Sequence, residues 1–121
     1  MVVDDESRIR DLARMILEDK GYEVITVGNG NEAVQKITVE MPDLVLLDIL
    51  MPGMNGFEVC KVLKSDPKTK QIPIVMFTVR SRDEGYELAR QVGCDGYFNK
   101  PFAPHDLVAE VKKHLRATAS T

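Results

Sequence analysis

Leu44-Val45-Leu46-Leu47-Asp48 is a block of four apolar residues that ends in a carboxylate. Short blocks of the same kind, rich in β-branched residues, occur at residues 24–27 and 74–77. A continuous apolar run of this length, without polar alternation, is typical of a strand buried on both faces of a parallel sheet. The intervening segments have the apolar spacing of helices, so the chain is predicted to alternate strands and helices.

Helical segments are marked by this spacing and by signals at their ends. The helices are predicted over residues 6–20, from an N-cap at Asn31 to before Pro42, over residues 56–64, over residues 82–91 and from about Pro104 onward. Gly21 and Gly93 stand where a left-handed residue after a helix is favoured. The fourth helix has few apolar residues, which predicts that it packs loosely.

The same spacing divides side chains between the core and the surface. Leu12 in the first helix and Leu88 in the fourth are expected on the faces turned to the sheet. Met15 is interpreted, like the other methionines, as a gap-filling residue and not as part of a binding surface. His105 and His114, on or beside the fifth helix, are expected on the surface.

Strict alternation of five strands and five helices predicts a doubly wound α/β fold. Its sheet is expected to be parallel, with helices on both faces. In such a sheet, binding sites lie outside the carboxyl ends of the strands, near the point where the strand order reverses. The residues that follow the strands are therefore the candidates for function.

The composition is that of one ordinary globular domain. The 121 residues are 44% hydrophobic and 29% charged, and the net charge of −3 without a cluster of Lys and Arg argues against direct nucleic-acid binding. The apolar runs are too short to span a membrane and no signal segment opens the chain, so a cytoplasmic location without membrane contact is expected. We expect residues 1–116 to form the domain and residues 117–121 to be a C-terminal tail or the start of a linker.

Polar residues follow the predicted strands and define a candidate site. Asp4 and Asp5 follow the first strand, Asp48 follows the third, Thr78 ends the fourth, and Lys100 follows the fifth. Three clustered carboxylates would repel one another unless a cation lay among them, and oxygen ligands without His or Cys favour Mg²⁺. A carboxylate surrounded by Mg²⁺, a lysine and a hydroxyl is suited to phosphoryl transfer, with Asp48 as the nucleophile.

Each of these residues also has a structural interpretation. Asp4 or Asp5 alone is more often a helix N-cap than a metal ligand. Thr78 could be a β-branched residue that finishes a strand, Lys100 a solvated lysine, and Tyr97 a half-buried aromatic residue. The functional interpretation gains its weight from the combination, because all of these residues stand at the ends of strands.

Four sequence blocks resemble the signature blocks of the receiver domains of two-component response regulators. They are Val2-Val3-Asp4-Asp5, the segment Leu46-Leu47-Asp48-Ile49-Leu50-Met51-Pro52-Gly53-Met54-Asn55-Gly56, Phe77-Thr78 and Tyr97-Phe98-Asn99-Lys100-Pro101-Phe102. Together they extend over nearly the whole chain, in the order and at the strand ends that the family uses. The resemblance implies the flavodoxin-like receiver fold, a doubly wound α/β fold whose five-stranded parallel sheet has the order 2-1-3-4-5. In comparison with the family the first strand is short, so the N-terminus is expected to be trimmed.

The resemblance implies a metal site and a phosphoryl acceptor. Asp48 would accept the phosphoryl group from a sensor histidine kinase or a phosphotransfer protein. Asp5, Asp48 and the backbone carbonyl of Leu50 would ligate Mg²⁺, with Asp4 acting mainly through water. The domain would catalyse its own phosphorylation and dephosphorylation but turn over no external metabolite.

The resemblance also implies a switch. Thr78 would give its hydroxyl to a phosphoryl oxygen, Lys100 would pair with the phosphoryl group, and Tyr97 would be the aromatic residue whose rotamer reports the state. The bond between Lys100 and Pro101 would be cis. A downstream effector domain or protein would read the face formed by the fourth helix, fifth strand and fifth helix.

Other functions and some departures from the family pattern stay open at this point. A Mg²⁺-dependent phosphohydrolase with an aspartyl-phosphate intermediate is the main alternative, although haloacid-dehalogenase-type phosphatases carry an acidic residue where this chain has Leu50. A degenerate receiver that binds a partner constitutively is a further one. Val79 and Arg80 follow the threonine, and the branched Val79 is expected to restrict access to Asp48. Gly96 and Glu110 differ from the residues usual in the winged-helix transcription-factor subfamily and argue against that subfamily.

Overall fold

The computed structural model of the chain describes residues 1–79 and 82–119, with side chains for residues 1–79 and 85–115. The strands are β1 (Val2–Val3), β2 (Thr26–Val27), β3 (Val45–Leu47), β4 (Ile74–Thr78) and β5 (Gly96–Asn99). The helices are α1 (Ser7–Asp19), α2 (Gly30–Glu40), α3 (Gly56–Ser65), α4 (Arg82–Gln91) and α5 (Pro104–Ala119). Strands and helices alternate along the whole described chain, as predicted.

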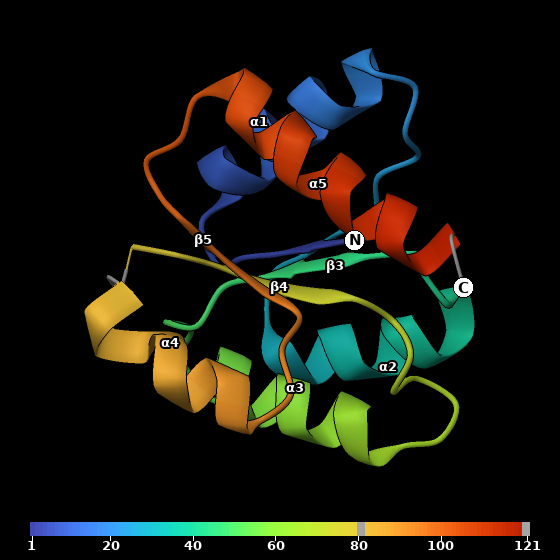
Figure 1. Ribbon diagram of the computed structural model, residues 1–121, viewed down its shortest axis with the longest axis vertical. Coiled ribbons are helices and arrows are strands. Elements are labelled where there is room, and N and C mark those ends of the chain that lie inside the picture. The colour runs from blue at the N-terminus through green and yellow to red at the C-terminus, as the bar shows by residue number, and fades with distance from the viewer. Residues whose placement is uncertain (80–81, 120–121) are drawn as a thin grey trace.

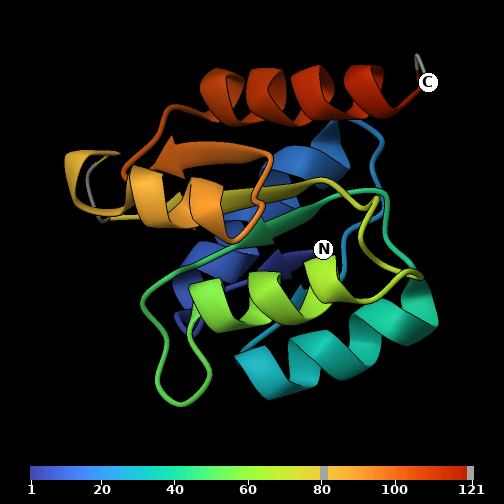
Figure 2. The same ribbon diagram turned by 60° about the horizontal axis from the view of Figure 1, so that its bottom comes forward.

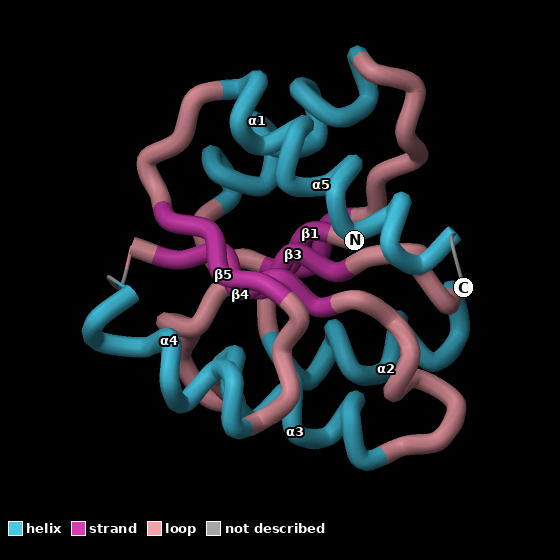
Figure 3. Tube along the Cα trace, in the orientation of Figure 1, coloured by secondary structure: helices cyan, strands magenta, loops and turns pink. Residues whose placement is uncertain are grey.

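The five strands form one parallel sheet in the order β2-β1-β3-β4-β5, which confirms the predicted doubly wound topology. Helices α1 and α5 cover one face, and α2, α3 and α4 cover the other (Figure 1). Figure 2 shows the same layers from another side, with α5 in red crossing above the sheet. The strands therefore lie in the middle of the molecule, between two helical layers (Figure 3).

Two apolar clusters fill the space on either side of the sheet. Leu46 packs in the cluster under α1 and α5, and its neighbour Leu47 packs in the cluster over α2, α3 and α4. Val2 and Val3 divide in the same way. Successive side chains of a strand point to opposite faces, so a strand between two helical layers must be apolar at every position. This requirement explains the continuous apolar blocks of the sequence.

The start of α2 differs from the prediction. Its N-cap is Asn29, not Asn31, and the Asn29 side chain accepts a hydrogen bond of 2.8 Å from the backbone N–H of Glu32. Gly30, the first residue of α2, packs closely on the neighbouring β3–α3 loop, where a Cβ would lie 2.6 Å from the carbonyl oxygen of Met54. This tertiary contact involves the residue between the two asparagines, which helical spacing alone does not reveal.

Three side chains that were expected to be buried are exposed. Leu12 is 41% exposed, Met15 64% and Leu88 45%, because each helix turns only a narrow stripe toward the sheet. In α1 this stripe is occupied by Ala13 and Leu17, both buried.

His114 was expected on the surface and is buried instead. Its ring lies against the backbone of Gly96 in β5, which has no side chain to exclude it, and its Nε2 lies 2.8 Å from the Glu110 carboxylate. His105 is exposed, as predicted.

Helix α5 continues through Ala119, beyond the predicted boundary at residue 116, and the division into domain and tail stays a prediction. Within the described residues, each helix is too short or too polar to cross a membrane.

Candidate functional site

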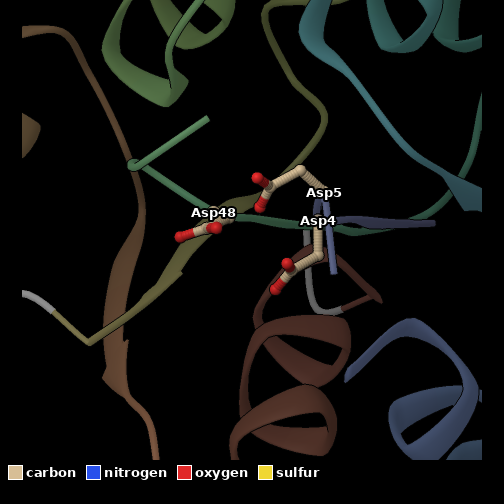
Figure 4. Close-up of side chains that lie close together, drawn as sticks. All are labelled: Asp4, Asp5 and Asp48. Atoms are coloured by element: carbon tan, nitrogen blue, oxygen red, sulfur yellow. The ribbon is translucent and has the colours of Figure 1, made fainter. Parts of the chain in front are cut away.

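The ends of β1 and β3 bring the three aspartates together. Val3 pairs with Leu47, and the backbone N–H of Asp48 donates to the Val3 carbonyl at 2.9 Å, so the residues after both strands emerge side by side. Each of Asp4, Asp5 and Asp48 offers a carboxylate oxygen within 4.8 Å of the others (Figure 4). The cluster predicted from the strand ends is therefore present in the structure.

The three carboxylates have different surroundings. Asp4 and Asp48 are buried, whereas Asp5 is exposed. Asp4 accepts a 2.9 Å hydrogen bond from the backbone N–H of Glu6 through Oδ1 and pairs with Lys100 through Oδ2. Within the described part of the chain, the Asp5 carboxylate makes no hydrogen bond or ion pair. Asp5 is thus the carboxylate that the protein leaves available to solvent or to a cation.

Lys100 supplies the positive charge of the site. Its Nζ lies 2.5 Å from Asp4 Oδ2 and 3.6 Å from Asp48 Oδ2, and its side chain is 7% exposed. The ammonium also lies 5.0 Å from the centre of the Phe77 ring. Phe77 packs in turn against Phe102, with ring centres 5.2 Å apart. The Phe77 ring and two carboxylates therefore fix the Lys100 ammonium beside the acidic cluster.

Burial raises the pKa of Asp48 to about 6. Lys100 acts in the opposite direction, Asp4 raises the pKa further, the backbone N–H of Leu50 lowers it, and Asp5 raises it. The Leu50 N–H donates to Asp48 Oδ1 at 3.3 Å. Desolvation prevails over these opposing effects, so a cation at the site would favour the ionised form of Asp48.

Thr78 and Lys100 are brought together by the pairing of β4 and β5. Thr78 is fully buried, and its carbonyl oxygen accepts the backbone N–H of Lys100 at 2.9 Å. The Lys100–Pro101 peptide bond is cis, as the resemblance implies. Tyr97 is half-buried, and its ring packs edge-on against Tyr86 of α4 with centres 6.0 Å apart.

The donor set suits a hard divalent cation. It consists of carboxylate oxygens from three residues, and within the described chain no His or Cys joins the cluster. Oxygen ligands of this kind match Mg²⁺, which accepts one or two carboxylates and completes its shell with water. The Leu50 side chain is 46% exposed and Val79 is 64% exposed; the carbonyl ligand and the restricted access stay predictions. Arg80 lies outside the described residues.

Sequence reasoning missed two residues of this site. One is Phe77, whose ring lies under Lys100, and the other is Arg10, whose Nη1 donates to the backbone carbonyl of Asp4 at 2.6 Å. A cation near the start of a helix opposes the helix dipole, but this signal applies to Arg8 as well and does not identify the contact of Arg10.

Comparison with known proteins identifies a family and similar chains. Residues 1–112 match the family described as the response regulator receiver domain. The chain is 39% identical over 116 residues to the DNA-binding response regulator MtrA of Mycobacterium tuberculosis, covering 96% of this chain and 50% of that protein. It is 41% identical over 118 residues to the phosphate regulon transcriptional regulatory protein PhoB of Pseudomonas aeruginosa, covering 98% and 52%.

Among solved structures, the chemotaxis protein CheY4 of Vibrio cholerae superposes with a TM-score of 0.88 at 35% identity, covering 93% of both chains. The chain spans about half the length of the curated relatives that it matches. Two of these relatives are named as DNA-binding or transcriptional regulators, so their names do not support the argument from Gly96 and Glu110 against a transcription-factor subfamily.

Proposed function

The chain belongs to the family of response-regulator receiver domains, and we propose on this basis that Asp48 is the residue through which it is phosphorylated. Receiver domains of two-component systems are phosphorylation-activated signalling switches and not dedicated metabolic enzymes. The observation that carries the proposal is that the Asp48 carboxylate lies beside those of Asp4 and Asp5 and 3.6 Å from the ammonium of Lys100.

The resemblance to the family implies a role for each residue of the site. Asp5, Asp48 and the Leu50 carbonyl would hold Mg²⁺, with Asp4 acting mainly through water. When bound, Mg²⁺ would neutralise charge on the transferred phosphoryl group. An Asp48 carboxylate oxygen would attack phosphorus while the bond between phosphorus and the donor histidine breaks. Burial disfavours the ionised nucleophile, so the site is suited to react in its cation-loaded form.

Lys100 and Thr78 would then stabilise the product. Phosphorylation adds negative charge and acceptor oxygens at Asp48, which attract the nearby ammonium and the Thr78 hydroxyl through charge-assisted hydrogen bonds. The same groups would support self-catalysed phosphorylation and hydrolysis of the acyl phosphate.

The expected partners are a sensor histidine kinase or phosphotransfer protein upstream and an effector domain or protein downstream. The effector would read the face formed by α4, β5 and α5, where Tyr97 and Tyr86 are in contact. This domain would not itself bind nucleic acid or membrane, and it would act in the cytoplasm.

The acceptor is tested by incubating the protein with a small phosphodonor and Mg²⁺ and measuring intact mass. We expect a single phosphoryl adduct on wild type and none on Asp48→Asn. Asp11→Asn, a change of the same kind at an exposed site on α1, should be labelled like wild type. Labelling of Asp48→Asn at the wild-type extent would refute the assignment, and rapid multiple turnover of phosphate esters would favour a phosphohydrolase.

A further inference from the structure

We propose that Arg10 is a positioning residue for the Asp4–Asp5 peptide. We also propose that Gly28, in the loop between β2 and α2, keeps the Arg10 guanidinium in place. The inference rests on the proposed function, because it concerns how Asp4 and Asp5 are presented to a cation. It adds to that function a contact to the backbone of the acidic pair, distinct from the contact of Lys100 with the Asp4 side chain.

The contact of Arg10 acts on the peptide that joins the two aspartates. Its guanidinium Nη1 donates to the carbonyl oxygen of Asp4 at 2.6 Å. A peptide unit is planar, so fixing this oxygen fixes the orientation of the whole Asp4–Asp5 peptide and the direction of the Asp5 Cα. Because the described chain gives the Asp5 carboxylate no hydrogen bond, the backbone has the main part in aiming it.

The other polar groups of Asp4 are already held by neighbouring segments. Its N–H donates to the Val27 carbonyl at 3.1 Å, Oδ1 accepts from the Glu6 N–H, and Oδ2 pairs with Lys100. The Arg10 contact completes this set at the carbonyl oxygen. These contacts fix the position of Asp4, and the Asp4–Asp5 peptide that Arg10 orients sets the direction of the exposed Asp5.

Gly28 supplies the space that the guanidinium occupies. A Cβ at Gly28 would lie 3.3 Å from Arg10 Nη1, and the three nearest atoms it would meet all belong to the Arg10 guanidinium. The φ angle of Gly28 is outside the left-handed region, so its backbone does not itself demand glycine. The close approach of Arg10 gives the physical reason for a residue without a side chain here.

Helix stability does not explain the placement of Arg10. It lies in the first turn of α1, which has no acidic residue, and a cation there opposes the helix dipole. Local choices that oppose an element's own stability are expected mainly at functional sites. The contact with Asp4 explains why an arginine stands at this position.

The start of α2 contacts the loop between β3 and α3. Gly30 packs against the Met54 carbonyl in the loop that follows Asp48 along the chain. The short segment 28–30 therefore lies between Arg10, which holds the Asp4–Asp5 peptide, and the loop that leaves the phosphoacceptor strand. A change in this segment is expected to alter the relative placement of the carboxylates.

The test is the dissociation constant for Mg²⁺, measured by titrating MgCl₂ and following the amide chemical shifts around Asp5 and Asp48. Arg10→Ala and Gly28→Val are each expected to raise it about ten-fold, as loss of an outer contact to metal ligands does. Gly28→Ala should have a smaller effect. Gly28→Val leaves every charge in place, so its effect reports position and not electrostatics.

Coupling between the two residues makes the test specific. In the Arg10→Ala background, Gly28→Val should change the constant less than two-fold, because the atoms that the new side chain would displace are gone. Arg14→Ala, which removes the same charge from an exposed position on α1, should also stay within two-fold of wild type.

Three results would overturn the proposal: unchanged affinity in Gly28→Val, tighter Mg²⁺ binding in Arg10→Ala, or additive effects in the double variant. Thermal unfolding checks that each variant is folded. A wild-type protein that binds no Mg²⁺ would refute the proposed function together with this inference.

Discussion

Asp48 holds a carboxyl group where its charge is costly, and the cost depends on pH. Its pKa is about 6 in the folded protein, against an ordinary value of 3.8, mainly because the group is buried. Between these two pH values the folded state binds more protons than the unfolded state. The free energy of unfolding therefore falls as pH rises through this window, and the penalty is fully present above the folded pKa.

Without divalent cations, Asp48→Asn should be more stable than wild type above pH 6, by about 1–3 kcal/mol. The difference should shrink toward pH 4, where wild type is protonated in the folded state. Urea unfolding of both proteins across this pH range measures it, with Asp11→Asn as the control whose difference from wild type should vary little with pH. An Asp48→Asn advantage that is independent of pH would contradict the raised pKa of Asp48.

Gly96 and His114 show at the level of elements how β5 accepts α5. A Cβ at Gly96 would lie 2.6 Å from His114 Nε2 and 3.3 Å from Val75 Cγ2. The ring cannot move aside cheaply, because it is buried and its Nε2 lies 2.8 Å from the Glu110 carboxylate. The three residues Gly96, Glu110 and His114 therefore form one packing unit between strand and helix.

Gly96→Ala is expected to destabilise the protein by about 1–3 kcal/mol through overpacking. In a His114→Ala background the same change should cost much less, because the ring that it meets is absent. Thermal or urea unfolding of the four proteins in this cycle gives the coupling energy. An equal loss in both backgrounds would mean that the contact with His114 is not the cause.

The elements of this fold are predictable where the pattern is local. The alternation of strands and helices and the bounds of α4 at Arg82–Gln91 follow from spacing and end signals. The start of α2 does not, because Asn29 and Asn31 are equally good caps and the packing of Gly30 on another loop is a tertiary contact. The burial of His114 is hidden in the same way, since it depends on a glycine in a different element.

In the candidate site, too, local patterns could be predicted from the sequence and tertiary contacts could not. Asp4, Asp5, Asp48, Thr78 and Lys100 could be predicted together because the carboxyl ends of parallel strands meet at one edge of the sheet. The roles of Phe77 and Arg10 could not, because they depend on where long side chains turn after the backbone is folded. Spacing places a residue on an element, but a contact between two elements needs their relative positions.

At the scale of the whole molecule, β4 and β5 connect the acidic cluster of Asp4, Asp5 and Asp48 to the face formed by α4, β5 and α5. Thr78 ends β4, and its carbonyl oxygen accepts a hydrogen bond from the backbone N–H of Lys100. Thr78 pairs with Asn99 of β5. Tyr97 lies two residues earlier in the same strand and contacts Tyr86 of α4. Helix α4 turns Ala89 to the core but leaves Leu88 45% exposed. A helix with so few buried apolar side chains is suited to move when Asp48 is phosphorylated.

Phosphorylation can bias such a movement only by its differential stabilisation of the active form, typically about 1–3 kcal/mol. If the Thr78 hydroxyl carries this bias, Thr78→Ala should still be phosphorylated but should respond weakly, whereas Thr78→Ser, which keeps the hydroxyl, should respond like wild type. The measurement is the change in amide chemical shifts on adding beryllofluoride and Mg²⁺, a phosphoryl mimic. In wild type the changes should reach α4 and Tyr97, and in Thr78→Ala they should be reduced there while persisting around Asp48. If the chemical-shift changes in wild type were confined to residues around Asp48, the signal would not pass through Thr78 to the face formed by α4, β5 and α5.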